Sequence, residues 1–144
     1  MIIHGDTDAS YLVLPKDRSR IAGYLFLRNH PPPTDTPKPK LNGPILTVCQ
    51  TINNVVALEA EAETGGMLLN GQKMVPIRNT IIAMDQPQPE NVNPLKFDSK
   101  TGVDILRLFM NPKRSKSRDM KYYWLEDCTK TGHLNPYCKR GIHN

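Results

Sequence analysis

The sequence has few of the residues that mark several classes of protein. Aromatic residues make up only 6% of the 144 residues, and the three cysteines show no CxxC or other metal-ligand spacing. An odd, scattered set of cysteines predicts reduced thiols in an intracellular protein, cytoplasmic or nuclear, without a disulfide framework. No apolar run approaches a membrane span, and the N-terminus lacks the basic and apolar regions of a secretory signal. We therefore expect neither a membrane protein nor an exported one.

What the sequence does contain is typical of one soluble globular domain. Hydrophobic residues make up 38% of the chain, and its length leaves little room for a second domain. The net charge is +5 and the isoelectric point is near 9.2. This charge suits an anionic partner, although many basic proteins bind none.

The pattern of apolar residues, glycine and proline predicts three strands, two helices, a strand, two helices and a last strand. The predicted strands cover residues 1–14, 19–29, 44–50, 95–99 and 133–141, and the predicted helices cover residues 55–75, 77–85, 101–110 and 119–132. Pro76 is expected to separate the first two helices, Asp119 to cap the last helix, and Pro136 to weaken the last strand. The first three strands read as an antiparallel meander, so the order favours a mixed sheet with helices packed against it.

Acidic residues recur at the ends of these elements. Asp6 and Asp8 lie two apart on the first strand, so their side chains share a face, and like charges that close repel unless a cation lies between them. Further acids are Glu59, Glu61 and Glu63 on the first predicted helix and Asp98 at the end of a later strand. Acids gathered from separate elements can hold Mg²⁺, and a pair of such ions can activate a water against a phosphodiester. For each acid taken singly, spacing alone favours a role as a solvated, turn or capping residue.

A basic segment at residues 113–118, KRSKSR, has the same ambiguity. Lysine and arginine beside hydroxyl groups suit contacts with nucleic-acid phosphates. A run of charge is also typical of a solvated loop.

Five stretches follow one another along the chain: GDTDASY, SRIAGYLFL, EAEAETGGMLLN, LKFDSKTG and NPKRSKSRDMKYYWLED. In this order they resemble one known family, the ribonuclease H (RNase H) domain of copia-type LTR retrotransposon polyproteins. The resemblance runs along nearly the whole chain. It implies an α/β, RNase H-like fold for residues 1–144, with a mixed sheet of about five strands, three antiparallel and then parallel, and helices on its faces.

The resemblance also implies a site and a reaction. The family's metal-binding and catalytic acids match Asp6, Glu63 and Asp98, with Asp8 and Glu61 as alternatives to the first two. In the family these acids hold two Mg²⁺ ions, and a metal-activated water cuts the RNA strand of an RNA–DNA hybrid. Basic residues that meet nucleic-acid phosphates match Lys113, Arg114 and Lys116. The implied partners are an RNA–DNA hybrid or other nucleic acid and a retroelement reverse transcriptase.

The chain departs from the family's pattern at its C-terminal end. It reads YCKRGIHN and stops at Asn144, about where the family has a segment with a fourth acid. We therefore expect a domain truncated before the last catalytic segment, with the second Mg²⁺ weakly bound or missing and with low or no turnover. Two alternatives follow: an inactive nucleic-acid-binding remnant of a decayed retroelement, and a non-functional reading frame that folds poorly.

Overall fold

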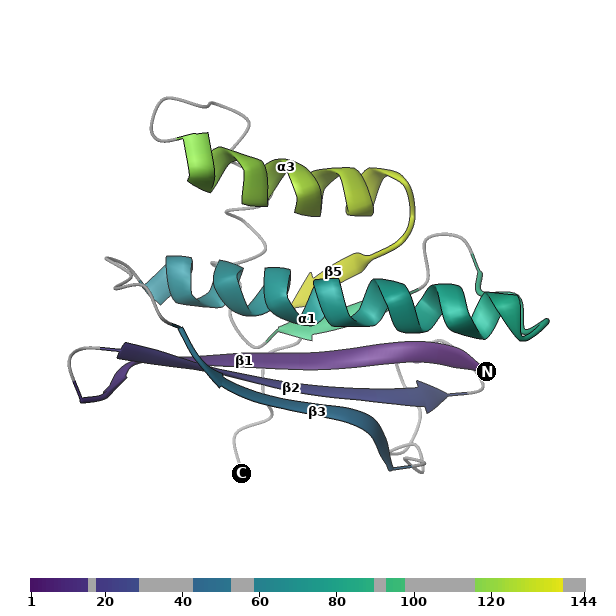
Figure 1. Cartoon of the computed structure of the whole chain (residues 1–144), viewed down its shortest axis with the longest axis horizontal. Helices are drawn as coiled ribbons and strands as arrows, with labels where there is room; N and C mark the ends of the chain where they lie inside the picture. Colours follow the sequence, from purple (N-terminus) through teal and green to yellow (C-terminus); the bar gives the residue numbers. More distant parts are fainter. Residues whose placement is uncertain (16–17, 29–42, 53–58, 90–92, 98–115, 139–144) are drawn as a thin grey trace.

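A computed structural model describes residues 1–15, 18–28, 43–52, 59–89, 93–97 and 116–138. The elements are β1 (Ile2–Leu14), β2 (Arg18–Arg28), β3 (Pro44–Thr51), α1 (Glu59–Ala83), β4 (Pro94–Phe97), α3 (Lys116–Lys130) and β5 (Asn135–Cys138). Within these residues the strands form one five-stranded sheet in the order β3-β2-β1-β4-β5. β1, β2 and β3 pair antiparallel, and β4 and β5 continue the sheet in parallel with β1. The mixed sheet is confirmed, and Figure 1 shows α1 and α3 on the same side of it.

Helix α1 corrects one prediction, because it continues through Pro76 where a break between two helices was expected. Pro76 removes one backbone hydrogen bond from the helix. Its side chain is exposed, while Val75, Ile77 and Ile81 pack against the hydrophobic core on either side of it. Burial of these side chains holds the helix together across the proline, so tertiary packing overrides the local signal.

Helix α3 begins at Lys116, so Asp119 lies inside the helix and the prediction that it caps the helix is wrong. The C-terminal end of α3 is capped by a glycine. Gly132 has a φ of 72°, which favours glycine, and His133 N donates to Cys128 O at 2.9 Å. Gly132 N donates to Thr129 O at 3.2 Å, and the two bonds together form a Schellman motif. This turn sends the chain back into the sheet as β5. The expected helix at 101–110 lies outside the described residues.

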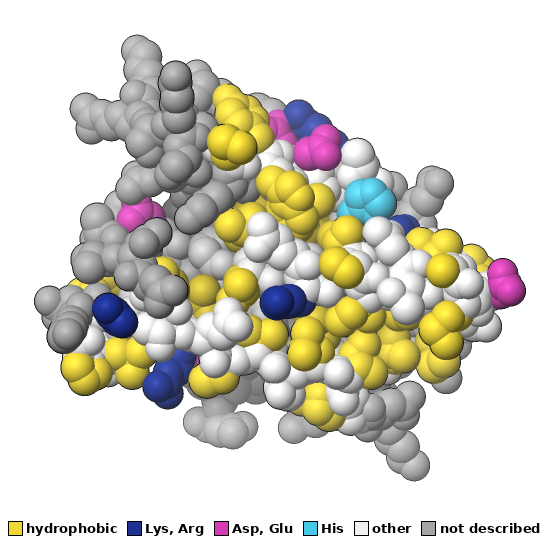
Figure 2. Space-filling view, in the orientation of Figure 1, with side chains coloured by type: hydrophobic (Ala, Val, Ile, Leu, Met, Phe, Trp, Pro, Cys, Tyr) yellow, Lys and Arg dark blue, Asp and Glu magenta, His cyan; other side chains and the backbone are white. Residues whose placement is uncertain are grey.

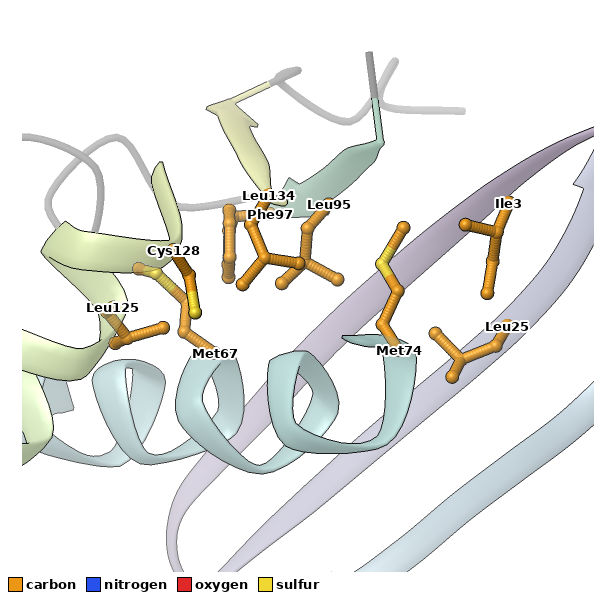
Figure 3. Close-up of a cluster of buried hydrophobic side chains, with 9 residues drawn as sticks. All are labelled: Ile3, Leu25, Met67, Met74, Leu95, Phe97, Leu125, Cys128 and Leu134. Atoms are coloured by element: carbon orange, nitrogen blue, oxygen red, sulfur yellow. The ribbon is translucent and has the colours of Figure 1, made fainter. Parts of the chain in front are cut away.

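The hydrophobic core lies between the sheet and the two helices (Figure 3). Strands, helices and the α3–β5 turn all contribute to it: Ile3, Leu25, Met67, Met74, Leu95, Phe97, Leu125, Cys128 and Leu134. Burial of these side chains supplies the main favourable term for folding. β5 lies at an edge of the sheet and contains Pro136, which fits the rule that proline within a sheet is confined to edges.

In the view of Figure 2, the surface formed by the described residues is mostly hydrophobic or uncharged polar, with some Lys, Arg, Asp and Glu side chains. In the part of the chain that the structure describes, no helix combines the length and apolar character needed to cross a membrane.

Candidate active site

A small hollow brings together two of the acids that the sequence singled out. It is lined by Thr7, Asp8 and Ala9 of β1, Glu63 of α1 and Phe97 of β4, and its empty volume is about 180 Å³, partly open to solvent. Asp8 is exposed and Glu63 is half-buried, whereas Thr7 and Phe97 are buried. Two acidic residues from distant parts of the sequence therefore line one hollow.

The hollow lies where β1 runs past the described end of β4. Asp6 is the register partner of Lys96, and β4 ends one residue later at Phe97. From Asp8 onward, this edge of β1 has no partner among the described residues of β4. The carboxyl ends of parallel strands are where α/β sheets commonly place their ligands.

On α1, the structure separates the two rival glutamates. Glu63 lines the hollow, and Glu61 is not among the described residues that line it. Residues two apart on an α-helix point about 200° away from each other around the helix axis, so Glu61 and Glu63 cannot share one face. The helix runs close to β1 at this point because Gly66, one turn beyond Glu63, has no side chain. A Cβ on Gly66 would lie 3.3 Å from Thr7 Oγ1 and 3.8 Å from Ala9 Cβ.

Asp6, the first choice for a metal ligand from the sequence, lies elsewhere. It is not among the residues that line the hollow, and its register partners are Tyr24 on β2 and Lys96 on β4. Lys96 in turn pairs with Tyr137 on β5. Register partners project to the same face of a sheet, so these four residues form a row across it.

The electrostatic surroundings of Asp6 match this placement. Burial raises the pKa of Asp6, and the positive charges of Lys96 and Arg28 oppose that effect. The pKa of Tyr137 is also raised, first by burial and then by the negative charge of Asp6, while Arg28 lowers it. Asp6 thus has two cations beside it that belong to the protein.

For the other predicted site residues, either the whole residue or its side chain lies outside the part of the chain that the structure describes. Asp98, Lys113 and Arg114 fall outside the described residues. Lys116 is the first residue of α3, and its side chain is not described. Among the residues that are described, no group of three or more His, Cys, Asp and Glu side chains is arranged to hold a metal ion.

Sequence reasoning missed two neighbours of the acids. Phe97 supplies the apolar wall of the hollow, and Thr7 ties β1 to the helix by accepting a hydrogen bond from Asn70 Nδ2 at 2.6 Å. Asn70 is a fully buried polar residue on α1. Its partners on β1 and β2 are far away along the chain, so the sequence alone does not reveal its role.

The sequence matches no protein-family model, and no curated protein is significantly similar to it. Solved structures do resemble the fold. An RNase H1 isolated from compost by a metagenomic approach aligns with a TM-score of 0.61 and 9% identity, over 96% of this chain and 84% of that one. The N-terminal RNase H domain of a Mycobacterium tuberculosis protein, solved as a maltose-binding-protein fusion, aligns with a TM-score of 0.61 and 11% identity, over 99% and 88% of the two chains.

A viral protein is similar over a smaller part of its length. The protease–reverse transcriptase of prototype foamy virus aligns with a TM-score of 0.51 and 15% identity, over 96% of this chain and 17% of that chain. At these identities the likeness establishes the fold alone. The chain has an RNase H-like fold, with its mixed five-stranded sheet and helices arranged as in these proteins.

Proposed function

We propose that this chain is an RNase H-like nuclease domain that hydrolyses the RNA strand of RNA–DNA hybrids and uses Asp8 and Glu63 as two of its acids. One observation carries the proposal: within an RNase H-like fold, residues Asp8 and Glu63 line the same hollow beside the end of β4. The sequence left Asp8 and Asp6 as alternatives. The shared hollow favours Asp8, and the paired surroundings of Asp6 favour a structural role for that residue.

The donor set fits a hard cation. Carboxylate oxygens are the ligands that Mg²⁺ prefers, and two residues that line the hollow carry carboxylates on separate elements. Mg²⁺ held by such acids would lower the pKa of a water and stabilise the leaving oxygen of a phosphodiester. The chain's own residues supply the acids, Glu63 from helix α1 and the exposed Asp8 from strand β1.

Asp98 is our proposed third acid. It matches the family's third acid in the resemblance described above, and it lies outside the described residues. In this proposal Lys113, Arg114 and Lys116 contact nucleic-acid phosphates, consistent with the net charge of +5. We also propose that the chain derives from a copia-type retrotransposon and acts together with a reverse transcriptase.

The test is cleavage of an RNA–DNA hybrid labelled on each strand in turn, with Mg²⁺ and separately with Mn²⁺. We expect cuts in the RNA strand that disappear in Glu63→Gln and Asp98→Asn. Glu61→Gln is the matched control, since it removes an equal charge two residues away and should keep the activity. Cleavage that survives Glu63→Gln would contradict the proposed site. A folded wild-type protein that binds the hybrid without cutting it would favour a nucleic-acid-binding domain without chemistry.

A further inference from the structure

Asn70 is a fully buried amide at the contact between α1 and the sheet. Its Nδ2 lies within hydrogen-bonding distance of three oxygens: Thr7 Oγ1 at 2.6 Å, Ala22 O at 3.1 Å and Gly66 O at 3.1 Å. The amide has two hydrogens, so one of them is shared. Thr7 Oγ1 also donates to Ala22 O at 3.2 Å. One side chain thereby connects α1 with both β1 and β2.

Two glycines next to Asn70 leave the space that its side chain occupies. A Cβ on Gly23 would lie only 1.8 Å from Asn70 Oδ1, so no other residue can stand at position 23 while the amide keeps its place. Gly66 is the second close approach, since its carbonyl accepts from Asn70 and its Cα faces Thr7. The amide therefore depends on glycine at two positions that are distant in sequence.

This arrangement carries a local energetic cost. Asn70 Oδ1 is buried and has no hydrogen-bond partner among the described residues. A buried polar atom without a partner costs free energy that an apolar side chain of similar size would avoid. Buried polar groups, unlike apolar ones, accept only a single arrangement of their neighbours. The amide thus gives up some stability and fixes one position of the helix on the sheet.

By holding α1 in one position on the sheet, Asn70 also holds the two acids in one position relative to each other. Glu63, Gly66 and Asn70 follow one another at helical spacing along one face of α1, because residues three and four apart are neighbours. Glu63 borders the hollow, and Thr7, the partner of Asn70, immediately precedes Asp8. A slide or rotation of α1 on β1 would break the bond to Thr7 and move Glu63 away from Asp8.

We propose that Asn70 is a positioning residue that sets the placement of Glu63 relative to Asp8 and so determines how tightly the pair binds a divalent cation. This inference rests on the proposed function of the two acids. Residues that orient metal ligands affect binding without touching the metal, and their loss typically weakens metal affinity tenfold to a hundredfold.

The experiment measures Mn²⁺ binding by titration calorimetry, together with thermal unfolding, on the full chain at a temperature where every variant is folded. Asn70→Ala should weaken Mn²⁺ binding by roughly tenfold. Met74→Ala is the matched control: it lies one turn further along α1, is fully buried in the core and should lower the melting temperature without changing Mn²⁺ affinity. Asn70→Leu, which fills the space without donating, should recover part of the melting temperature and none of the affinity.

The outcomes separate this inference from the proposed function. Equal Mn²⁺ affinity in Asn70→Ala and the wild type would overturn the inference, and so would an equal loss of affinity in Met74→Ala. Asp8→Asn and Glu63→Gln test the site itself. A wild type that binds no Mn²⁺, or binds it equally well in both acid variants, would overturn the proposed function and this inference together.

Discussion

Helix α1 contacts strand β1 in two places, and the two contacts differ in chemistry. Towards its N-terminus, Gly66 and Asn70 meet Thr7 through small and hydrogen-bonding groups. Towards its C-terminus, Met74 packs in the apolar core, where a Cβ added to Gly5 would lie 3.5 Å from Met74 Sδ. Apolar packing tolerates small shifts, whereas hydrogen bonds to fixed partners do not. The comparison indicates that one end of the contact supplies stability and the other places the acids.

The largest expected effect concerns the acids at the polar end. Asp8→Asn should lower the rate of RNA-strand cleavage by roughly a hundredfold or more, because a metal-stabilised transition state loses several kcal/mol. Asp6→Asn removes the same charge from the same strand and should leave most of the rate. Single-turnover cleavage of the labelled hybrid measures both. A larger loss from Asp6→Asn than from Asp8→Asn would reverse our assignment of the site.

The next effect probes the fit between Asn70 and the sheet. Gly23→Ala should reduce the free energy of unfolding by about 3 kcal/mol, since the new methyl group would overlap Asn70 Oδ1 and force a shift. In the Asn70→Ala background the same substitution should cost much less, and a double-mutant cycle in urea measures the difference.

Gly65→Ala serves as the control for Gly23→Ala. A Cβ at Gly65 would meet nothing closer than 3.7 Å, so alanine should stabilise the helix by roughly 0.5–1 kcal/mol. If Gly23→Ala costs the same with and without Asn70, the close contact between them does not exist in solution.

The sequence predicted the features that depend on local interactions, and it missed those that depend on residues far apart along the chain. The alternation of side chains and the proline-rich segments are local signals, and they predicted the meander and the mixed sheet correctly. The continuation of α1 through Pro76 could not be predicted, because it depends on packing against strands that are distant in the chain. The arrangement of the elements in space also decides which acid of β1 lines the hollow beside α1, and periodicity alone leaves Asp6 and Asp8 equivalent. Asn70 was missed for the same reason, and the roles of Asp98, Lys113 and Arg114 stay predictions.

A smaller effect concerns the face of β1 away from the Thr7–Asn70 contact. His4 is buried, stacks on Phe26 with ring centroids 5.5 Å apart, and its Nε2 has no hydrogen-bond partner among the described residues. Burial, and then the positive charge of Arg28, lower the pKa of His4 from 6.5 to about 4. The unfolded chain therefore binds a proton at His4 between these pH values and the folded chain does not, so folding stability falls as the pH drops through this range.

We expect His4 to account for about 2 kcal/mol of stability lost between pH 7 and pH 5. His4→Leu should remove this part of the pH dependence and leave the stability at pH 7 nearly unchanged. Asp6 acts in the opposite sense, because burial raises its pKa and protonation then favours the folded state. Asp6→Asn is therefore the companion variant in urea unfolding at the two pH values. An unchanged pH dependence in His4→Leu would mean that His4 is solvated in the folded protein.

The smallest effect lies at the apolar end of α1, where the helix keeps its course in spite of Pro76. Pro76→Ala restores a backbone N–H to an exposed helical position and should raise the free energy of unfolding by about 1 kcal/mol, less than the full cost of an interior proline because the packing of Val75 and Ile77 already holds the helix across it. Lys73→Ala, an exposed change nearby in the same helix, should alter stability little, and urea unfolding compares the two. Mn²⁺ affinity should stay the same in both, because the substituted positions lie beyond Asn70 from Glu63. A gain in stability accompanied by weaker Mn²⁺ binding would show that the two ends of the α1–β1 contact are coupled, and that Pro76 itself helps to place the acids.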